Sequence, residues 1–146
     1  MLTIGKESNY VKLKALAVYR LSEFAAQQGQ IDKAITLLDK GEGWSREAGW
    51  LRCLAWNKYL RGATLIKLGA SQEAEPFLKQ SLEMATSWCE RTLMANNSYG
   101  LAQIYKNTGQ FQLAHQMAEL SFDLYERLGA SRHIPPIKEL LSITVT

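Results

Sequence analysis

The amino-acid sequence predicts an all-α solenoid, an α-α superhelix built from three antiparallel helix pairs and a short C-terminal capping helix. The first observation is that four columns of identical residues recur at intervals of 40 residues. These columns are Tyr19, Tyr59 and Tyr99; Ala15, Ala55 and Ala95; Gly29, Gly69 and Gly109; and Ala34, Ala74 and Ala114. A period of 20 to 50 residues is typical of solenoids, whose repeats bury their faces on one another. The second observation is that apolar residues within each unit recur at helical spacing.

Each unit contains two helices on either side of a glycine. The first helices are expected near residues 10–28, 50–68 and 90–108, and the second helices near 31–48, 71–88 and 111–128. The glycines of the third column fall where a helix C-terminus favours a residue that tolerates a left-handed backbone. The alanines of the fourth column allow the paired helices to approach closely.

The C-terminal segment is expected to form a cap. After Gly129, the sequence Ile134-Pro135-Pro136 interrupts the helical phase, and Ile137–Ile143 resumes it. We predict a short seventh helix that covers the last repeat. The chain then forms one domain over residues 1–146, with repeats at about 10–49, 50–89 and 90–129 and a cap at 130–146.

Composition agrees with one ordinary globular domain: 146 residues, of which 47% are hydrophobic and 21% charged. The sequence contains no apolar run of the roughly 18 residues that a membrane-spanning helix needs, and its opening residues do not resemble a secretion signal. We therefore expect a cytoplasmic protein. Two cysteines, Cys53 and Cys89, are too few for a disulfide framework and lack metal-ligand spacing, so we expect free thiols.

The order of small and large residues resembles the tetratricopeptide repeat, W-x2-L-G-x2-Y followed by A-x3-F. The matching phrases are Leu101-Ala102-x2-Tyr105 before Gly109 and Ala114 in the third unit, Leu21-Ser22-x2-Ala25 before Gly29 and Ala34-x3-Leu38 in the first, and Gly62-x2-Leu65, Gly69 and Ala74-x3-Leu78 in the second. The 40-residue period resembles the longer form of the repeat found in kinesin light chain, Pins-type adaptors, and bacterial signal-transducing ATPases and MalT-like regulators. This resemblance implies a non-catalytic scaffold that binds a protein or peptide in a groove lined by the first helices, as the interaction or sensing part of a larger regulator or signalling protein.

Two faces of each first helix can be separated at about 100° per residue. One face carries the packing residues Val18, Leu21, Ser22 and Ala25, and a second face, about 140° away, carries the tyrosine column. We expect the second face to line the groove and to contact the partner. Its candidate contact residues are Tyr19, Glu23, Trp56, Tyr59, Lys67, Asn96, Tyr99, Gln103 and Lys106. Rigid rings and amides are typical of interfaces that anchor a peptide. The other interpretation is that the tyrosines only pack between neighbouring repeats.

Charge differs between the two sets of helices. The expected first helices carry nine basic and two acidic residues, a net charge of +7, whereas the second helices carry a net charge of −5. A positive groove favours an acidic segment or a peptide carboxylate as partner. Ordinary solvated charges and ion pairs between the layers are the other interpretation.

Two alternative functions remain from the sequence. A homo-oligomer is possible, because the first helix has no obvious covering partner and an open end permits self-association of a small adaptor. Single-stranded nucleic acid is a less favoured ligand, because a basic groove with tyrosine and tryptophan can stack bases, although no run of Lys or Arg occurs. His115 and His133 lie in no catalytic or metal-binding spacing, so we expect no enzymatic activity, cofactor or metal.

Overall fold

The computed structural model describes the backbone of residues 2–144 and the side chains of residues 9–142. The described part contains seven helices and no strand: α1 (Leu2–Gln27), α2 (Ile31–Glu47), α3 (Leu51–Lys67), α4 (Ser71–Ser87), α5 (Arg91–Asn107), α6 (Phe111–Leu128) and α7 (Ile134–Thr144). The all-α prediction is confirmed.

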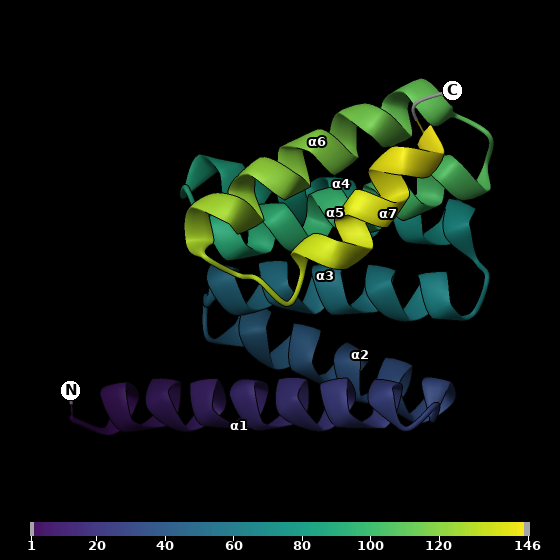
Figure 1. The fold of residues 1–146 in the computed structure, drawn as a ribbon. Helices are drawn as coiled ribbons and strands as arrows, with labels where there is room; N and C mark the ends of the chain where they lie inside the picture. Colours follow the sequence, from purple (N-terminus) through teal and green to yellow (C-terminus); the bar gives the residue numbers. More distant parts are fainter. Residues whose placement is uncertain (1, 145–146) are drawn as a thin grey trace.

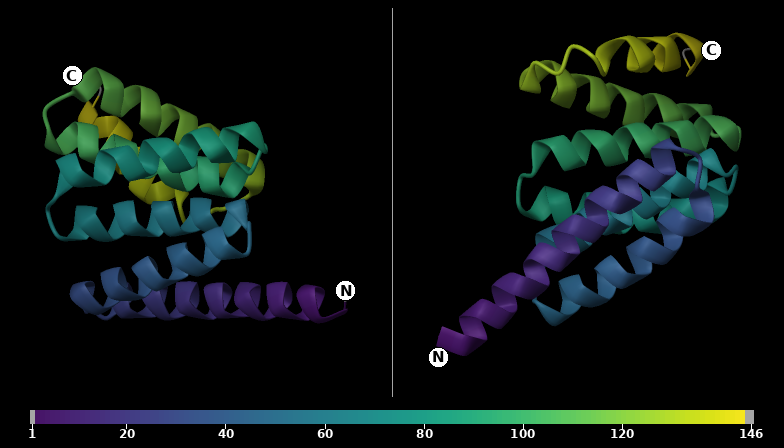
Figure 2. Two further views of the ribbon diagram at one scale, coloured as in Figure 1. Left: turned by 180° about the vertical axis from the view of Figure 1, so that it is seen from behind. Right: turned by 90° about the horizontal axis from the view of Figure 1, so that it is seen from below.

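The helices form two layers of a solenoid (Figure 1). Each helix packs against the next one in the chain, and the first helices α1, α3, α5 and α7 also contact one another in order. The second helices α2, α4 and α6 form the other layer. The two ends of the chain lie at opposite ends of the stack, with α1 at one end and α7 near the other (Figures 1 and 2).

Five of the six predicted repeat helices have ends within one residue of the expected positions, and the exception is α1. It begins at Leu2, eight residues earlier than the expected start near Tyr10. No proline interrupts residues 2–9, so the helix extends on its N-terminal side beyond the part that packs on α2. Its N-terminal part projects beyond α2 (Figure 2).

The turn glycines behave as predicted. Gly29, Gly69 and Gly109 have positive φ angles of 77°, 84° and 78°. In each turn the next residue donates its backbone N–H to the carbonyl five positions earlier, as Gln30 does to Ala25 at 2.9 Å. This closing pattern needs a left-handed residue just beyond the helix end. The turns between units use the same device at Gly49, Cys89 and Gly129, so Cys89 adopts φ 55° where the other two units have glycine.

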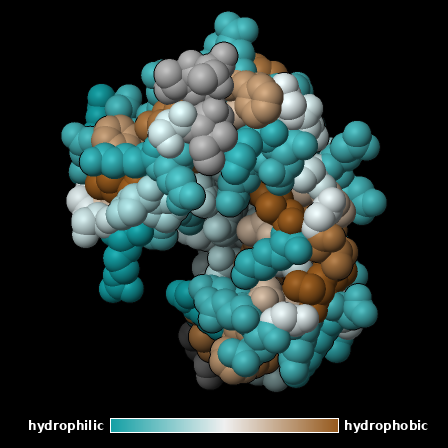
Figure 3. All heavy atoms as spheres, turned by 45° about the vertical axis from the view of Figure 1, so that its right-hand side comes forward, coloured by the Kyte–Doolittle hydropathy of each residue, from teal (hydrophilic) through white to brown (hydrophobic). Residues whose placement is uncertain are grey.

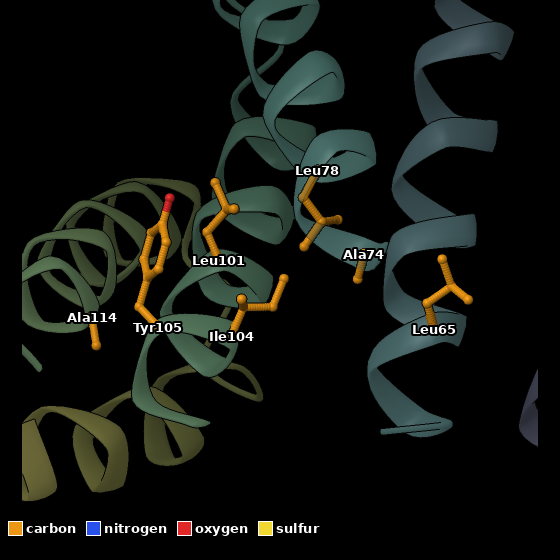
Figure 4. Packing of buried hydrophobic residues seen from close by; sticks show 7 residues of the cluster. All are labelled: Leu65, Ala74, Leu78, Leu101, Ile104, Tyr105 and Ala114. Atoms are coloured by element: carbon orange, nitrogen blue, oxygen red, sulfur yellow. The ribbon is translucent and has the colours of Figure 1, made fainter. Parts of the chain in front are cut away.

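Close approach of the helices depends on small residues around Leu78. Ala34, Ala74 and Ala114 are fully buried, as the sequence predicted for paired helices. Leu78 on α4 lies between Gly62 on α3 and Gly100 on α5: a Cβ atom at these glycines would lie 2.6 Å and 2.7 Å from the Leu78 methyl groups. Figure 4 shows Leu78 and Ala74 on α4 facing Leu65 on α3 on one side and Leu101 and Ile104 on α5 on the other.

The seventh helix continues the repeat. It begins at Ile134, so the two prolines lie inside its first turn rather than in a break before it, because that turn needs no backbone N–H donor. Ile137, which lies 40 residues after Asn97, is fully buried against α5 and α6. Helix α7 contacts α6 and α5 in the way that α5 contacts α4 and α3. It caps the last repeat, as predicted, and it does so as the first helix of a fourth, incomplete unit.

We predict that Ala74→Leu lowers the free energy of unfolding by about 1–3 kcal/mol, because no space exists for a larger side chain between α3 and α4. Gln72→Leu, on the exposed side of the same helix, is the matched control and should stay within about 0.5 kcal/mol of the parent. Urea denaturation measures both changes. Equal stability of the Ala74→Leu variant and the parent would contradict the close packing.

The left-handed backbone of Cys89 leads to a second prediction. A residue with a Cβ atom costs about 1–2 kcal/mol in the left-handed region, of which part is offset because glycine is more flexible in the unfolded chain. Cys89→Gly should therefore raise the free energy of unfolding by about 0.5–1 kcal/mol. Gly49→Ala, at the equivalent turn, should lower it by about 1 kcal/mol. Chemical denaturation of the two variants tests this, and destabilisation by Cys89→Gly is the contrary outcome.

Candidate functional site

The concave side of the first-helix layer contains a groove with a cavity volume of about 800 Å³. Figure 3 shows the surface hollowed on this side, between the upper and lower parts of the molecule. The structure places seven of the nine candidate residues in its lining: Tyr19, Glu23, Trp56, Tyr59, Lys67, Asn96 and Tyr99. They come from α1, α3 and α5, because residues 40 positions apart have the same orientation on successive first helices.

The other two candidates, Gln103 and Lys106, line a separate cavity of about 210 Å³. Tyr99 contributes to both cavities, and α7 supplies Pro136, Glu139 and Leu140 to the smaller one. Helix α7 lies over this end of the first-helix layer (Figure 1). The sequence pattern could not predict that the candidate residues divide between two cavities, because it gave no position for α7 relative to α5.

Three aromatic rings from α1 and α3 meet at their edges in the groove. The Tyr19 and Trp56 ring centres are 6.3 Å apart with an interplanar angle of 77°, and those of Trp56 and Tyr59 are 6.0 Å apart at 90°. Edge-to-face pairs of this kind hold rings in fixed orientations. Tyr19 is only 8% exposed and packs on Leu38 and Leu60. The tyrosine column thus contributes to packing between repeats as well as to the groove lining.

The lining also includes an aromatic pair that the sequence pattern did not predict. Tyr125 on α6 donates its hydroxyl to the Asn96 side-chain oxygen, and the His133 ring stacks on Tyr125 with centres 4.6 Å apart. Both residues line the groove. Tyr125 occupies the position that holds Ser45 and Ala85 in the earlier units. This departure from small residues was the available signal, but the contacts of the ring with Asn96 on α5 and with His133 could not be predicted from it.

Buried polar side chains fix the rotation of α3 and α5. Asn97 donates to the Ser81 hydroxyl at 2.8 Å, and Ser81 donates to the Ala55 carbonyl at 2.8 Å. In the preceding unit Asn57 donates to the Ser45 hydroxyl at 3.3 Å. Because both asparagines are buried on faces that pack against the preceding second helix, these bonds favour the orientation that directs the tyrosine column into the groove.

Burial raises the pKa of all four tyrosines in the groove lining, and this effect comes before any neighbouring charge. The Glu23 carboxylate adds to the raised pKa of Tyr19 and Tyr59, and Glu139 adds to that of Tyr99. The phenol groups are therefore neutral at physiological pH. Their hydroxyl groups can both donate and accept hydrogen bonds.

Only part of the positive charge of the first helices reaches the groove. Arg20, Arg52 and Lys67 line it, together with the acidic Glu23, which lies 3.2 Å from Arg20. Lys58 instead donates to Gln80 on α4 at 2.8 Å. A further basic residue is also turned away from the groove: Arg61 pairs with Asp39 and Glu42 on α2. These two positions face the preceding or following second helix, so the net charge of +7 overstates the charge along the groove.

The described residues include no group of three or more His, Cys, Asp or Glu side chains placed to hold a metal ion. Cys53 is buried and Cys89 exposed, and both are free thiols, as predicted. Burial raises the pKa of the Cys53 thiol.

The raised tyrosine pKa values predict loss of stability in alkali. Above about pH 10 the tyrosines of the unfolded chain ionise, while the buried tyrosines of the folded chain stay protonated. The free energy of unfolding should therefore fall as pH rises beyond that value. Urea denaturation at about pH 8 and about pH 11 measures the loss. Tyr19→Phe should reduce the difference between the two pH values. An unfolding free energy that is the same at both would contradict the burial of these phenols.

Comparisons with known proteins agree with the architecture. A family model described as tetratricopeptide repeat matches residues 51–127, which cover α3 to α6 and more than half of the chain. A search of curated proteins found no match. Within the described residues, no helix has both the length and the apolar character needed to cross a membrane. Repeats of this family generally mediate contacts between proteins and are typically non-catalytic. The chain belongs to the tetratricopeptide repeat family.

Proposed function

We propose that the protein is a non-catalytic scaffold that binds a protein or peptide segment in the groove lined by α1, α3 and α5. The observation that carries this proposal is the convergence of seven candidate residues, predicted from helical phase alone, on one cavity of about 800 Å³. Trp56, Tyr59 and Tyr99 supply partly exposed rings, and partly exposed rings that are already fixed lose little entropy on binding.

The proposed partner is an acidic segment or a peptide carboxylate. Arg20, Arg52 and Lys67 line the groove against the single carboxylate of Glu23. Arg52 lies near the Trp88 ring and 3.9 Å from Glu90. Most of its side chain is nevertheless exposed. The excess of positive charge is modest, so it favours specificity and rate of association more than affinity. The domain would serve as the interaction or sensing part of a larger cytoplasmic regulator.

Selection of binders from a random peptide library tests the proposal. Peptides enriched on the protein should carry acidic residues or a free C-terminal carboxylate, and should compete with one another for one site. Their affinity should fall when salt is raised, because screening weakens the attraction to Arg52 and Lys67. Enrichment that is independent of peptide charge would contradict the proposed partner class.

Ring truncation tests which residues contact the peptide. Tyr59→Ala and Tyr99→Ala should each weaken binding by about 2 kcal/mol, or roughly 30-fold, because rings at a buried anchor carry much of the affinity. Calorimetry measures the affinity, and thermal melting measures stability in the same samples.

Two other aromatic residues serve as controls. Phe111→Ala removes an exposed ring on α6 outside the groove and should leave affinity unchanged. Tyr105→Ala removes a buried side chain whose hydroxyl donates to the Glu75 carboxylate, and it should lower stability without changing affinity. If Tyr59→Ala and Tyr99→Ala behave like Tyr105→Ala, the tyrosine column serves packing and the groove assignment fails.

A further inference from the structure

Helix α1 leaves an apolar face uncovered at one end of the solenoid. This stripe consists of Tyr10, Leu13, Ala17, Leu21 and Phe24, and all five are exposed. Its four large side chains are between 54% and 64% exposed. Seen from below the stack, α1 lies in front of the other helices (Figure 2). Apolar side chains gathered on one helix face are typical of a contact surface.

The same face is buried in every later unit. At the positions two units, or 80 residues, further along the chain, α5 packs this face against α4. Leu13 is 64% exposed where the equivalent Leu93 is 1% exposed, and Phe24 is 60% exposed where the equivalent Ile104 is 1% exposed. The stripe is therefore equivalent to a stacking interface of the solenoid, and no helix in the described part of the chain covers it.

At the opposite end of the solenoid, the described side chains of α7 do not form a matching apolar surface. On α7, the positions equivalent to those with which α5 contacts α6 hold Pro135, Lys138 and Ser142, and all three are exposed. A polar end cannot bury an apolar stripe at low cost. Head-to-tail stacking of copies is thus disfavoured, and contact between two N-terminal ends is left.

The stripe is complementary to itself. Its residues are separated by steps of three, four, four and three, which read the same in both directions. When a second α1 lies antiparallel across it, Tyr10 faces Phe24 of the other copy, Leu13 faces Leu21, and Ala17 faces Ala17. The small central residue permits close approach, and the contact runs for roughly 20 Å along the helix.

Charged residues lie at the edges of the stripe. The Lys14 ammonium is 4.7 Å from the centre of the Tyr10 ring, and Arg20 pairs with Glu23 at 3.2 Å. Both cations thus already have partners on their own chain, at the rim where interfaces are usually polar.

We propose that two copies of this chain associate through this stripe, as a closed two-fold dimer with the α1 helices antiparallel. A two-fold contact uses the same residues on both partners and ends growth at two subunits. The groove of each copy opens on another face of α1, so the dimer presents two grooves.

Sedimentation equilibrium over a range of protein concentrations tests the proposal. The parent should shift from monomer to dimer, and Leu13→Glu and Leu21→Glu should each raise the dimer dissociation constant at least about tenfold. Leu113→Glu replaces an exposed leucine on α6 and should leave the dissociation constant unchanged. Circular dichroism verifies that each variant is folded. A parent that sediments as a monomer throughout, or as a species larger than a dimer, overturns the proposal.

Cysteine cross-linking tests the antiparallel geometry in a Cys89→Ser background, in which the remaining Cys53 is buried. Ala17→Cys should form a disulfide-linked dimer under mild oxidation, and a mixture of Leu13→Cys with Leu21→Cys should give the mixed dimer faster than either protein alone links to itself. Leu113→Cys is the control for random collision. Cross-linking of Ala17→Cys no faster than this control overturns the two-fold arrangement.

Discussion

The close approach of α4 to both neighbouring first helices is the constraint on which the rest of the structure depends. Leu78 fits between Gly62 and Gly100 with no room for a Cβ atom at either glycine. Helices that approach this closely have little freedom to slide or rotate, because a shift of one residue would place a larger side chain at the contact. The separation of α3 from α5, and hence the width of the groove between them, follows from this contact.

Buried hydrogen bonds fix the rotation of α3 and α5 about their axes, which packing alone does not. Asn57 and Asn97 are buried, yet each keeps a hydroxyl acceptor on the preceding second helix and leaves its own side-chain oxygen without a protein partner. Any other rotation of α3 or α5 would leave the amide unsatisfied as well, at a cost of about 1–3 kcal/mol. This cost disfavours alternative rotations that the surrounding small residues would tolerate, so the tyrosines remain on the concave side.

Much of the fold could be predicted because its signals are local. A glycine at five of the six turns and a 40-residue period were enough to place the ends of α2 to α6. Helical phase was enough to predict that Trp56 and Tyr59 line one groove. What could not be predicted depends on neighbours in space. Tyr125 lies at the groove between Asn96 on α5 and the His133 ring, which comes just before α7. Arg61 turns away from the groove because Asp39 and Glu42 on α2 attract it. The early start of α1 had no signal, since a helix can continue wherever nothing stops it.

The register of α7 gives the concave wall a direction. The tyrosine column continues from Tyr99 to position 139, which is a glutamate, and Glu139 and Tyr99 line the same small cavity. The wall thus carries a neutral phenol on each of three helices and a carboxylate on the fourth, while the ion pair of Arg20 with Glu23 lies on the first. A surface whose two ends differ in charge is not equivalent to its own reversal. A chain lying along it in one sense meets different chemistry from the same chain in the opposite sense.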